Sequence, residues 1–585
     1  MLVVFFHLGF SGFNSGFLAV DVFFVISGYL IAVMYDPAKK ADFFIKRAKR
    51  LLPAYFAVLI ITLLLSIVIT TPNEYAQVSE QAIFATLFSS NIGFWLETSY
   101  FDKAAFKPLL HFWSLGVEIQ FYLLVPFLYW IFKKVKFSYL LILVASAFLC
   151  FFVVCISPKT SFFWMPLRLW EFLIGYGVAK YIYKGQNSRT EIWSWMGAAS
   201  LLGVICIPLI PVDGTALSFK SGHPGLMALI ISLFTAVTLS FGLPKKIEEN
   251  PLFNFLEKIG GYSYSIYLAH FPVIVLFLYK PFSGTVLEAE NLTQIISLVT
   301  LVIGASFLLF KFVERPFREK KSSLIWGFSA IASVLLIYPL GMFAQKIIVP
   351  EKDMLVYQAW LDRSTYRCGK LARIFNPGAV TCEITSQLTA PSHRILLVGN
   401  SHADSIKSTF ASVAHSKNVA VYFIVENNPL MIGGMTPHEL IAEAHAKNID
   451  NIVLHYSPNS IENKTIIQLL ALSKIENIKI SLIMPVPVWD KHVPMTILES
   501  RHGATNLPTR NLNSYLKNNI SLIDAVSNIK DDNFKVYQVA DVFCHSTCLL
   551  MSDSGKPLYF DAGHLTLTGS EMLKGVFNKL LVNLQ

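Results

Sequence analysis

The chain has 585 residues, of which 54% are hydrophobic and only 15% charged, and its mean hydropathy is +0.53. A soluble domain of this length seldom carries so few charges, so the composition excludes an ordinary soluble protein and indicates a membrane protein. The formal net charge of +10 does not indicate a nucleic-acid partner, because the basic residues cluster in short loops between apolar runs, as orientation signals do.

The opening segment, MLVVFFHL, is too short to span a bilayer. No basic region precedes it and no cleavage site follows, which argues against a signal peptide. We expect it to be the end of a helix whose beginning lies before Met1.

Apolar runs of about 20 residues, long enough to cross the hydrocarbon core, then recur through the first 348 residues. They predict an all-α transmembrane bundle of about 10–11 helices. The expected spans lie at residues 17–35, 51–70, 110–132, 139–156, 162–183, 194–211, 223–241, 262–280, 293–313 and 323–345. A shorter amphipathic run at 82–96 is expected to lie at the membrane surface or to re-enter.

Basic residues orient these spans, because Lys and Arg concentrate on the cytoplasmic side. The run KKADFFIKRAKR (39–50) marks the loop before the 51–70 span as cytoplasmic. Alternation then places the basic loops at 133–138, 184–193, 243–261 and 314–322 on the same side. The last span delivers residues 349–585 to the outer face.

Ionisable residues within spans are costly, and they are functional candidates by default. His7 ends the first apolar run, His111 and Glu118 lie about 10 Å apart on one helix face, and Arg168 and Glu171 lie in a further span. Snorkelling or a structural ion pair explains each one alone. Together we interpret them as a substrate pathway.

Four cysteines lie in the polar part as two local pairs, Cys368 with Cys382 and Cys544 with Cys548. No CxxC or HxxxH pattern accompanies them, so they predict two disulfides rather than a metal site. Disulfides indicate an oxidising compartment, in agreement with the outer placement. The remaining cysteines lie in apolar spans, where we expect inert packing: Cys150, Cys155 and Cys206.

From residue 393 onward the sequence alternates between strand and helix patterns. Strands are predicted at 394–401, 419–426, 451–457, 478–486 and 535–543, with helices at 436–447, 461–475, 511–527 and 568–583. The alternation predicts a parallel sheet flanked by helices, with a site at the carboxyl ends of the strands.

The first of these strands ends at Ser401, and Asp561 and His564 lie near the end of the chain. A serine at a strand-to-helix turn exposes its hydroxyl, and the amides at the helix start can hold an oxyanion. Asp561 can orient the imidazole while His564 accepts the serine proton. Alternatively, Ser401 is only a helix N-cap and Asp561 and His564 only form a turn. The presence of both motifs in one domain favours catalysis.

These motifs make residues 393–585 resemble an SGNH-type hydrolase domain, because GNSH matches its first block and DAGHLT its last. The resemblance implies a flavodoxin-like α/β/α fold, with Ser401 as nucleophile and Asp561 and His564 as the base pair. Asn400 replaces the usual Asp. The oxyanion residues of the middle blocks are not placed; the candidates are Gly433, Asn427 and Asn459.

Residues 1–320 resemble the acyltransferase-3 family of bacterial membrane acyltransferases. Six segments carry the resemblance: GFLAVDVFFVISGYLI (16–31), KRAKRLLPAY (46–55), HFWSLGVEIQFY (111–122), RLWEFLIG (168–175), GGYSYSIYLAHFP (260–272) and VERPFR (313–318). It implies that His7 is the functional histidine, and that Arg47 and Arg50 contact the phosphates of the acyl-CoA donor. Arg47 and Arg50 could otherwise be plain orientation signals. The resemblance also implies an arginine about eleven residues before that histidine, at a position that would precede Met1.

The resemblances imply a transmembrane acyltransferase domain at 1–322, an additional helix at 323–348, a disulfide-bearing linker at 349–392 and an extracytoplasmic SGNH domain at 393–585. The expected activity moves an acyl group, acetyl by resemblance, from cytoplasmic acetyl-CoA across the bacterial inner membrane to a surface polysaccharide. Lipopolysaccharide O-antigen is the expected acceptor, and peptidoglycan is the alternative. An exporter with an accessory domain and an anchored esterase remain open.

Overall fold

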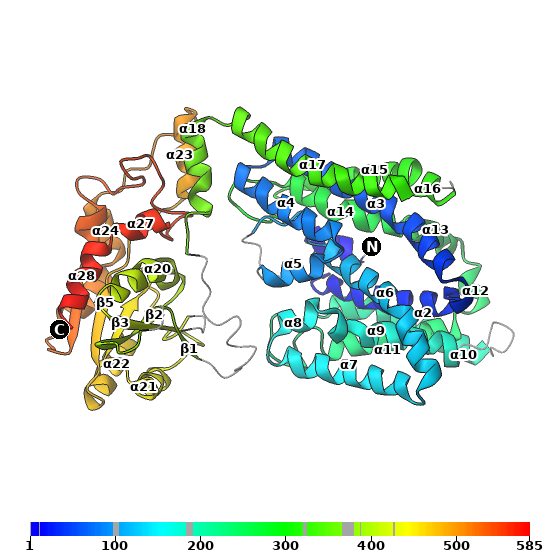
Figure 1. The fold of residues 1–585 in the computed structure, drawn as a ribbon, viewed down its shortest axis with the longest axis horizontal. Coiled ribbons are helices and arrows are strands. Elements are labelled where there is room, and N and C mark those ends of the chain that lie inside the picture. Colours follow the sequence, from blue (N-terminus) through cyan, green and yellow to red (C-terminus); the bar gives the residue numbers. More distant parts are fainter. Residues whose placement is uncertain are drawn as a thin grey trace. The chain divides into compact units, whose positions relative to one another are not determined.

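The computed structural model describes residues 2–10, 12–97, 105–182, 191–319, 324–364, 380–385, 388–424 and 428–584. The chain divides into two compact units, Met1–Ile347 and Ile348–Gln585 (Figure 1).

The first unit is a bundle of apolar helices. Its longer helices are α2 (Ala19–Met34), α3 (Lys40–Ile69), α4 (Pro72–Thr86), α6 (Phe112–Lys134), α7 (Ser138–Val154), α9 (Met165–Gly177), α10 (Glu191–Cys206), α11 (Leu226–Phe241), α14 (Ser263–Phe277), α15 (Leu292–Leu309) and α17 (Leu324–Ile348). Its shorter helices are α1 (Leu2–His7), α5 (Ser90–Leu96), α8 (Pro158–Phe163), α12 (Lys245–Glu248), α13 (Pro251–Gly260) and α16 (Arg315–Glu319).

Within the described residues, six helices are long and apolar enough to cross a membrane. A seventh span results if α13 and α14, which meet at 65°, count as one bent segment. The prediction of a multi-pass membrane bundle is therefore confirmed. The expected 10–11 spans include α7 and α11, which are apolar but shorter than the length that spans a bilayer unaided.

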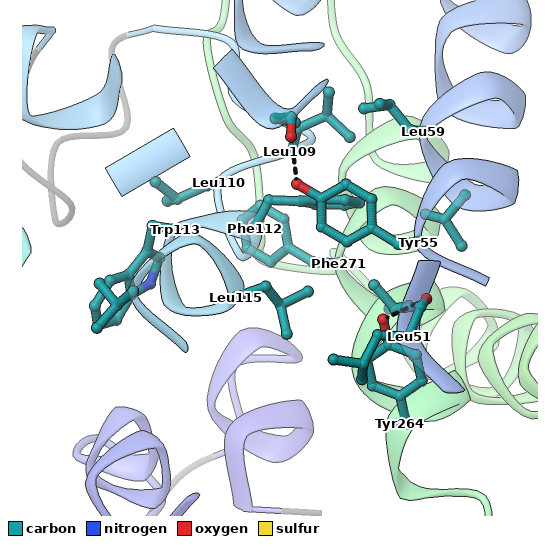
Figure 2. Close-up of a cluster of buried hydrophobic side chains, with 14 of the residues drawn as sticks. Leu51, Tyr55, Leu59, Leu109, Leu110, Phe112, Trp113, Leu115, Tyr264 and Phe271 are labelled. Carbon is teal, nitrogen blue, oxygen red and sulfur yellow. Dashed lines mark hydrogen bonds between the residues drawn. The ribbon is translucent and has the colours of Figure 1, made fainter. Parts of the chain in front are cut away.

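An aromatic core joins α3, α6 and α14 (Figure 2). The Tyr55 and Phe112 rings have centroids 4.6 Å apart. The Tyr55 hydroxyl donates to the Ala85 carbonyl at 2.7 Å, and the Tyr264 hydroxyl donates to the Leu51 carbonyl at 2.9 Å. These bonds satisfy hydroxyl groups that would otherwise be costly in an apolar interior, and they join α3 to α4 and to α14.

Helices α2 and α9 approach closely at two glycines. A Cβ on Gly28 would lie 1.9 Å from a backbone oxygen of α9, and a Cβ on Gly175 would lie 1.9 Å from a backbone oxygen of α2. Small residues permit such close helix contact in membrane bundles. The contact brings Asp21 on α2 next to Arg168 on α9.

Several predicted boundaries in this unit are wrong. Residues 40–50 of the basic run, expected as a loop, form the first turns of α3, because the Lys, Arg and Ala residues favour helix and Phe43 is buried. The predicted 162–183 span is broken at Trp164, where Pro166 in the first turn of α9 starts a new helix. The 82–96 run is divided between α4 and α5, and the 243–261 loop contains α12 and α13.

The second unit is an α/β domain around a six-stranded sheet, which confirms the predicted fold class. The strands are β1 (Thr381–Glu383), β2 (His393–Gly399), β3 (Val419–Ile424), β4 (Asn451–His455), β5 (Lys479–Ile483) and β6 (Phe534–Tyr537). Their order is β1-β3-β2-β4-β5-β6. Strands β2 to β6 are parallel, whereas β1 pairs antiparallel with β3 and was not predicted, because three residues are too few to show a pattern.

The helices of this unit are α18 (Glu351–Tyr357), α20 (Ser401–His415), α21 (Pro437–Ala446), α22 (Asn463–Ile475), α23 (Val493–Arg501), α24 (Leu512–Asn518), α25 (Ile520–Ser527), α26 (Ala540–Phe543), α27 (Leu567–Glu571) and α28 (Lys574–Val582). Each of the predicted helices at 511–527 and 568–583 is two helices, and the strand predicted at 535–543 ends at Tyr537.

The sheet order places β2 between β3 and β4. The chain therefore leaves β2 toward one side of the sheet and later returns to its other side. Ligand sites of open parallel sheets lie at such a switch point, beyond the carboxyl end of the strand. Ser401 follows that end of β2.

Candidate active sites

The turn that presents Ser401 is built by the two residues before it. A Cβ on Gly399 would lie 1.8 Å from the His455 carbonyl oxygen of β4, so only glycine permits this approach. The Asn400 side chain caps α20 by accepting from the His402 amide at 3.1 Å, and its amide donates to the Ser457 hydroxyl at 2.8 Å. Ser401 is the exposed first residue of α20.

Asp561, His564 and Ser401 form a continuous hydrogen-bonded chain. His564 Nδ1 lies 2.6 Å from Asp561 Oδ2, and His564 Nε2 lies 2.6 Å from Ser401 Oγ. An ionised carboxylate only accepts, so Nδ1 carries the hydrogen and Nε2 is the acceptor for the serine hydroxyl. The geometry is that of a general base poised on a nucleophile.

The carboxylate of Asp561 is held in place by its own loop. Its Oδ1 accepts from the amides of Gly563 and His564, each at 2.8 Å. Burial alone raises the pKa of Asp561, but the hydrogen bond and charge of His564, together with these amides, outweigh burial and lower it. Asp561 is therefore ionised at neutral pH.

A second histidine lies against the first. The His402 and His564 ring centroids are 4.6 Å apart. Burial, followed by the proximity of His564 and His455, lowers the pKa of His402 to about 3. His402 therefore stays neutral and does not compete with His564 for a proton.

The oxyanion candidates remain a prediction. Gly433 has a φ of +80° in the turn after β3, and a Cβ there would meet no atom within 4 Å. The Asn459 side chain donates to the Asn518 carbonyl at 3.3 Å. Asn427 lies outside the described residues. The Ser401 amide at the start of α20 is suited to be one donor.

Cys544 and Cys548 form a disulfide. Cys368 lies outside the described residues, so its pairing with Cys382 stays a prediction. Cys150 is buried, as expected, but Cys155 and Cys206 are exposed on the helical unit, so the expectation of packing is wrong for those two. Among the described residues, no group of three or more His, Cys, Asp or Glu side chains could hold a metal ion.

In the helical unit, His7 pairs with a histidine that sequence reasoning had not singled out. His7 Nδ1 lies 3.0 Å from His270 Nε2. His270 Nδ1 lies 2.7 Å from the Tyr267 carbonyl, which can only accept, so Nδ1 of His270 carries the hydrogen. In a neutral His270, Nε2 then accepts from His7 Nδ1, and Nε2 is the basic nitrogen of His7.

His111 lies next to this pair, with its ring centroid 5.7 Å from that of His270. Its Nε2 lies 3.0 Å from the Leu268 carbonyl and therefore carries the hydrogen. Its Nδ1 is a buried acceptor that has no hydrogen-bond partner within the described residues. Tyr267 continues the polar set, because its hydroxyl lies 2.6 Å from Ser114 Oγ.

Glu118 lies two turns further along α6 and is 3% exposed. Its Oε1 accepts from Ser27 Oγ at 2.7 Å and from the Tyr122 hydroxyl. The Arg47 guanidinium lies 5.5 Å from the centroid of the same tyrosine ring, whereas Arg50 is half-buried on the next turn of α3. His7, His111, Glu118 and Arg47 are thus buried members of one helical unit, and a substrate pathway through them stays a prediction.

Arg168 and Glu171 form a separate ionic cluster. Arg168 Nη2 lies 2.5 Å from Asp21 Oδ1 and 3.2 Å from Glu171 Oε2, and all three side chains are fully buried. His223 Nε2 lies 3.8 Å from Asp21 Oδ2. Their partners are within the protein, so the structural ion pair explains them at least as well, and a substrate role stays a prediction.

Two residues that the sequence analysis did not single out, His270 and Asp21, nevertheless carried a recognisable signal. His270 and Asp21 both stand in segments that carried the family resemblance, YLAHFP and GFLAVDVFF. An ionisable residue inside an apolar span is itself a signal of function. Applied to every span, that rule would have found both.

Comparisons with known proteins match both units. The family described as the acyltransferase domain matches residues 1–311, and the SGNH domain that is fused to such domains matches residues 367–579. The O-acetyltransferase OatA of Staphylococcus aureus strain COL is 30% identical over 372 residues, which cover 59% of this chain and 58% of OatA. A provisionally named O-acetyltransferase of strain MRSA252 is 30% identical over 355 residues, which cover 56% of this chain and 57% of that relative. The chain thus spans little more than half the length of these relatives.

A solved structure also matches, that of the periplasmic domain of a lipopolysaccharide acetyltransferase from Salmonella ser. Paratyphi A. It has 17% identity and a TM-score of 0.29, and the match covers 40% of this chain and 98% of that domain.

Proposed function

Because the chain belongs to the acyltransferase family, with an SGNH domain fused behind its membrane domain, we propose that it is a membrane-bound O-acyltransferase. It moves an acetyl group from cytoplasmic acetyl-CoA across the bacterial inner membrane to a hydroxyl of a surface glycan, with lipopolysaccharide O-antigen as the acceptor. The names of the two staphylococcal relatives support O-acetyl transfer as the reaction.

The single observation that carries the proposal is the chain of hydrogen bonds from Asp561 through His564 to Ser401, in a domain that follows a membrane bundle. A serine and base of this kind form and break esters. Ser401 Oγ attacks the carbonyl carbon of the delivered acetyl group, His564 Nε2 takes the hydroxyl proton, and the group that carried the acetyl leaves with that proton. A sugar hydroxyl then attacks the Ser401 ester, His564 Nε2 takes the sugar hydroxyl proton, and Ser401 Oγ leaves with it.

The membrane unit would supply the acetyl group. Arg47 and Arg50 are suited to bind the phosphates of the donor on the cytoplasmic side. His7 would be the acceptor or relay of the acetyl group, with His111 and Glu118 along its route. The basic loops favour a cytoplasmic donor side and an extracytoplasmic Ser401. Peptidoglycan is the alternative acceptor.

Glycan O-acetylation in cells that carry wild type, Ser401→Ala or His7→Ala tests the proposal. Both variants are expected to lose acetylation, measured as acetate released from isolated lipopolysaccharide, and separately from peptidoglycan, by mild base. Ser416→Ala, at the far end of α20, is the matched control and should acetylate normally. Normal acetylation by both Ser401→Ala and His7→Ala would show that the relay is wrong. Intact glycan export together with lost acetylation in these variants would exclude the alternative that the protein is an exporter.

A further inference from the structure

A set of half-exposed aromatic and basic side chains adjoins the Ser401 site and takes no part in the proposed acetyl transfer to Ser401. Phe560, the residue before Asp561, stacks beside the His564 ring, with centroids 5.5 Å apart and planes at 14°. Trp360 meets Phe560 edge-on at 5.8 Å. The Arg363 guanidinium lies 3.7 Å above the Trp360 ring and 5.8 Å from the Phe560 centroid.

The segment that carries Trp360 and Arg363 is fixed to the catalytic loops. The Asp362 carbonyl accepts from the Leu567 amide at 2.7 Å, and the Asp362 carboxylate accepts from the Thr568 hydroxyl at 2.5 Å. Ser364 Oγ lies 2.5 Å from Ser408 Oγ of α20. Residues ahead of the first strand are thus placed at the rim of the site that Ser401 and His564 occupy.

Packing alone does not account for these side chains. Trp360, Arg363 and Phe560 are all partly exposed rather than core residues, although the unit has a well-formed core. A half-exposed aromatic side chain leaves part of an apolar ring in contact with solvent, and a contiguous group of such side chains beside a reactive residue is a candidate binding surface. A guanidinium carries five N–H donors in one plane, a set that suits the hydroxyl oxygens of a bound ligand.

An apolar ring face next to planar donors matches one chemical class. A sugar ring has a face of C–H groups that packs on an aromatic ring, and hydroxyl oxygens at its edge that accept hydrogen bonds. We propose that Trp360, Arg363 and Phe560 form the acceptor subsite, which holds a sugar residue of the glycan with one hydroxyl directed at Ser401. This inference rests on the proposed function, because it names the group that receives the acetyl.

The subsite explains how transfer would prevail over hydrolysis. The Ser401 acetyl ester can be attacked by a sugar hydroxyl or by water, and in each case His564 Nε2 takes the proton and Ser401 Oγ leaves with it. A sugar held next to the ester has an effective concentration far above that in solution. Removal of the subsite therefore shifts the products from acetylated sugar toward free acetate.

The test uses the full chain in detergent with p-nitrophenyl acetate, which acetylates Ser401 directly and needs no membrane relay. The acceptor is lipopolysaccharide whose O-acetyl groups have been removed, and glycan strands of O-deacetylated peptidoglycan form a second arm. The measured quantity is the ratio of acetylated sugar to free acetate for each nitrophenol released. Trp360→Ala and Arg363→Gln are expected to lower this ratio about tenfold each, the effect of one lost stacking or hydrogen-bonding contact.

Arg394→Gln is the matched control, because Arg394 lies at the other end of β2 and should keep the wild-type ratio. If Trp360→Ala abolishes nitrophenol release through misfolding, Arg363→Gln and Trp360→Phe decide the question. An unchanged ratio in Arg363→Gln and in the folded Trp360 variant overturns the subsite. Wild type that releases nitrophenol no faster than Ser401→Ala overturns the proposed function instead.

Discussion

The two units each hold one histidine through its Nδ1, but with different partners in different surroundings. In the C-terminal unit, His564 donates to the Asp561 carboxylate at 2.6 Å, and their side chains are 26% and 30% exposed. In the helical unit, His7 donates to the neutral His270 ring at 3.0 Å, and these residues are 3% and 0% exposed. Both arrangements leave Nε2 as the basic nitrogen.

The difference in partner follows from the difference in solvent. The Asp561 carboxylate is 30% exposed and accepts two backbone amides, which offset its burial, and it can stabilise the imidazolium that would form when His564 takes a proton. An isolated carboxylate inside a membrane bundle would be far more costly. A neutral imidazole can orient His7 without adding a charge. We therefore expect His564 to become charged in its proposed role, whereas His7 would carry out its proposed role while it stays neutral.

The largest expected effect comes from removing the charge beside His564. Asp561→Asn should lower Ser401-dependent nitrophenol release by about 10³–10⁴-fold, because the Asn amide can donate to Nδ1 and reverse the tautomer that the serine needs. The rate of hydrolysis of p-nitrophenyl acetate by the full chain measures this. Asp541→Asn, in α26, is the matched control. A loss of less than tenfold would mean that His564 needs no carboxylate, and the contrast with His7 would fail.

A smaller effect is expected where the partner is neutral. His270→Phe removes the acceptor for His7 Nδ1 and should lower acetyl transfer from acetyl-CoA to the glycan by about 10²-fold, the range of a lost orienting contact in acid–base catalysis. His270→Gln can still accept through Oε1 and should recover most of the activity. The assay is transfer of radiolabelled acetyl in membrane vesicles.

The conservative variant separates positioning from packing. Gln is no better than Phe at filling the space of an imidazole, so recovery by Gln alone indicates a hydrogen-bonding role. Both variants should keep Ser401-dependent nitrophenol release, because His270 belongs to the other unit. Equal losses in His270→Phe and His270→Gln would reduce His270 to a packing residue.

The sequence predicted the C-terminal unit better than the membrane unit, for a physical reason. Five buried strands and a local DxxH motif are short-range signals, and Asp561 and His564 meet within one loop. The pairing of His564 with Ser401 was predicted because the first and last motifs of the domain resemble those of SGNH-type hydrolases. By contrast, His7 and His270 lie 263 positions apart, and only the folded bundle brings them together.

Polar partners of the membrane unit were hard to predict because hydropathy reports only that a segment is apolar. Asp21 meets Arg168 because glycines on α2 and α9 let the two helices approach closely, and no periodicity in either helix predicts that contact. Proline breaks, as at Pro166, divided spans that composition alone had joined. Trp360 was missed because it precedes the first strand, in a segment assigned to the linker.

The smallest expected effect concerns buried histidines that take no proton in catalysis. Burial lowers the pKa of His455 to about 4 and, with neighbouring histidines, that of His402 to about 3, below the ordinary value near 6.5. Between pH 6.5 and 4 the unfolded chain therefore binds more protons than the folded one, so stability falls as the pH falls. Each histidine changes the free energy of unfolding by at most about 1.4 kcal/mol per pH unit.

Pulse proteolysis of the full chain in urea at pH 7.5 and pH 5, followed on fragments of residues 393–585, measures this loss. His455→Gln should reduce the difference between the two pH values, whereas His438→Gln, on the exposed face of α21, should not. Asp561, whose pKa is also lowered, titrates below this window and does not contribute to it. Equal pH dependence in wild type and His455→Gln would mean that this buried neutral histidine does not set the acid stability of the unit.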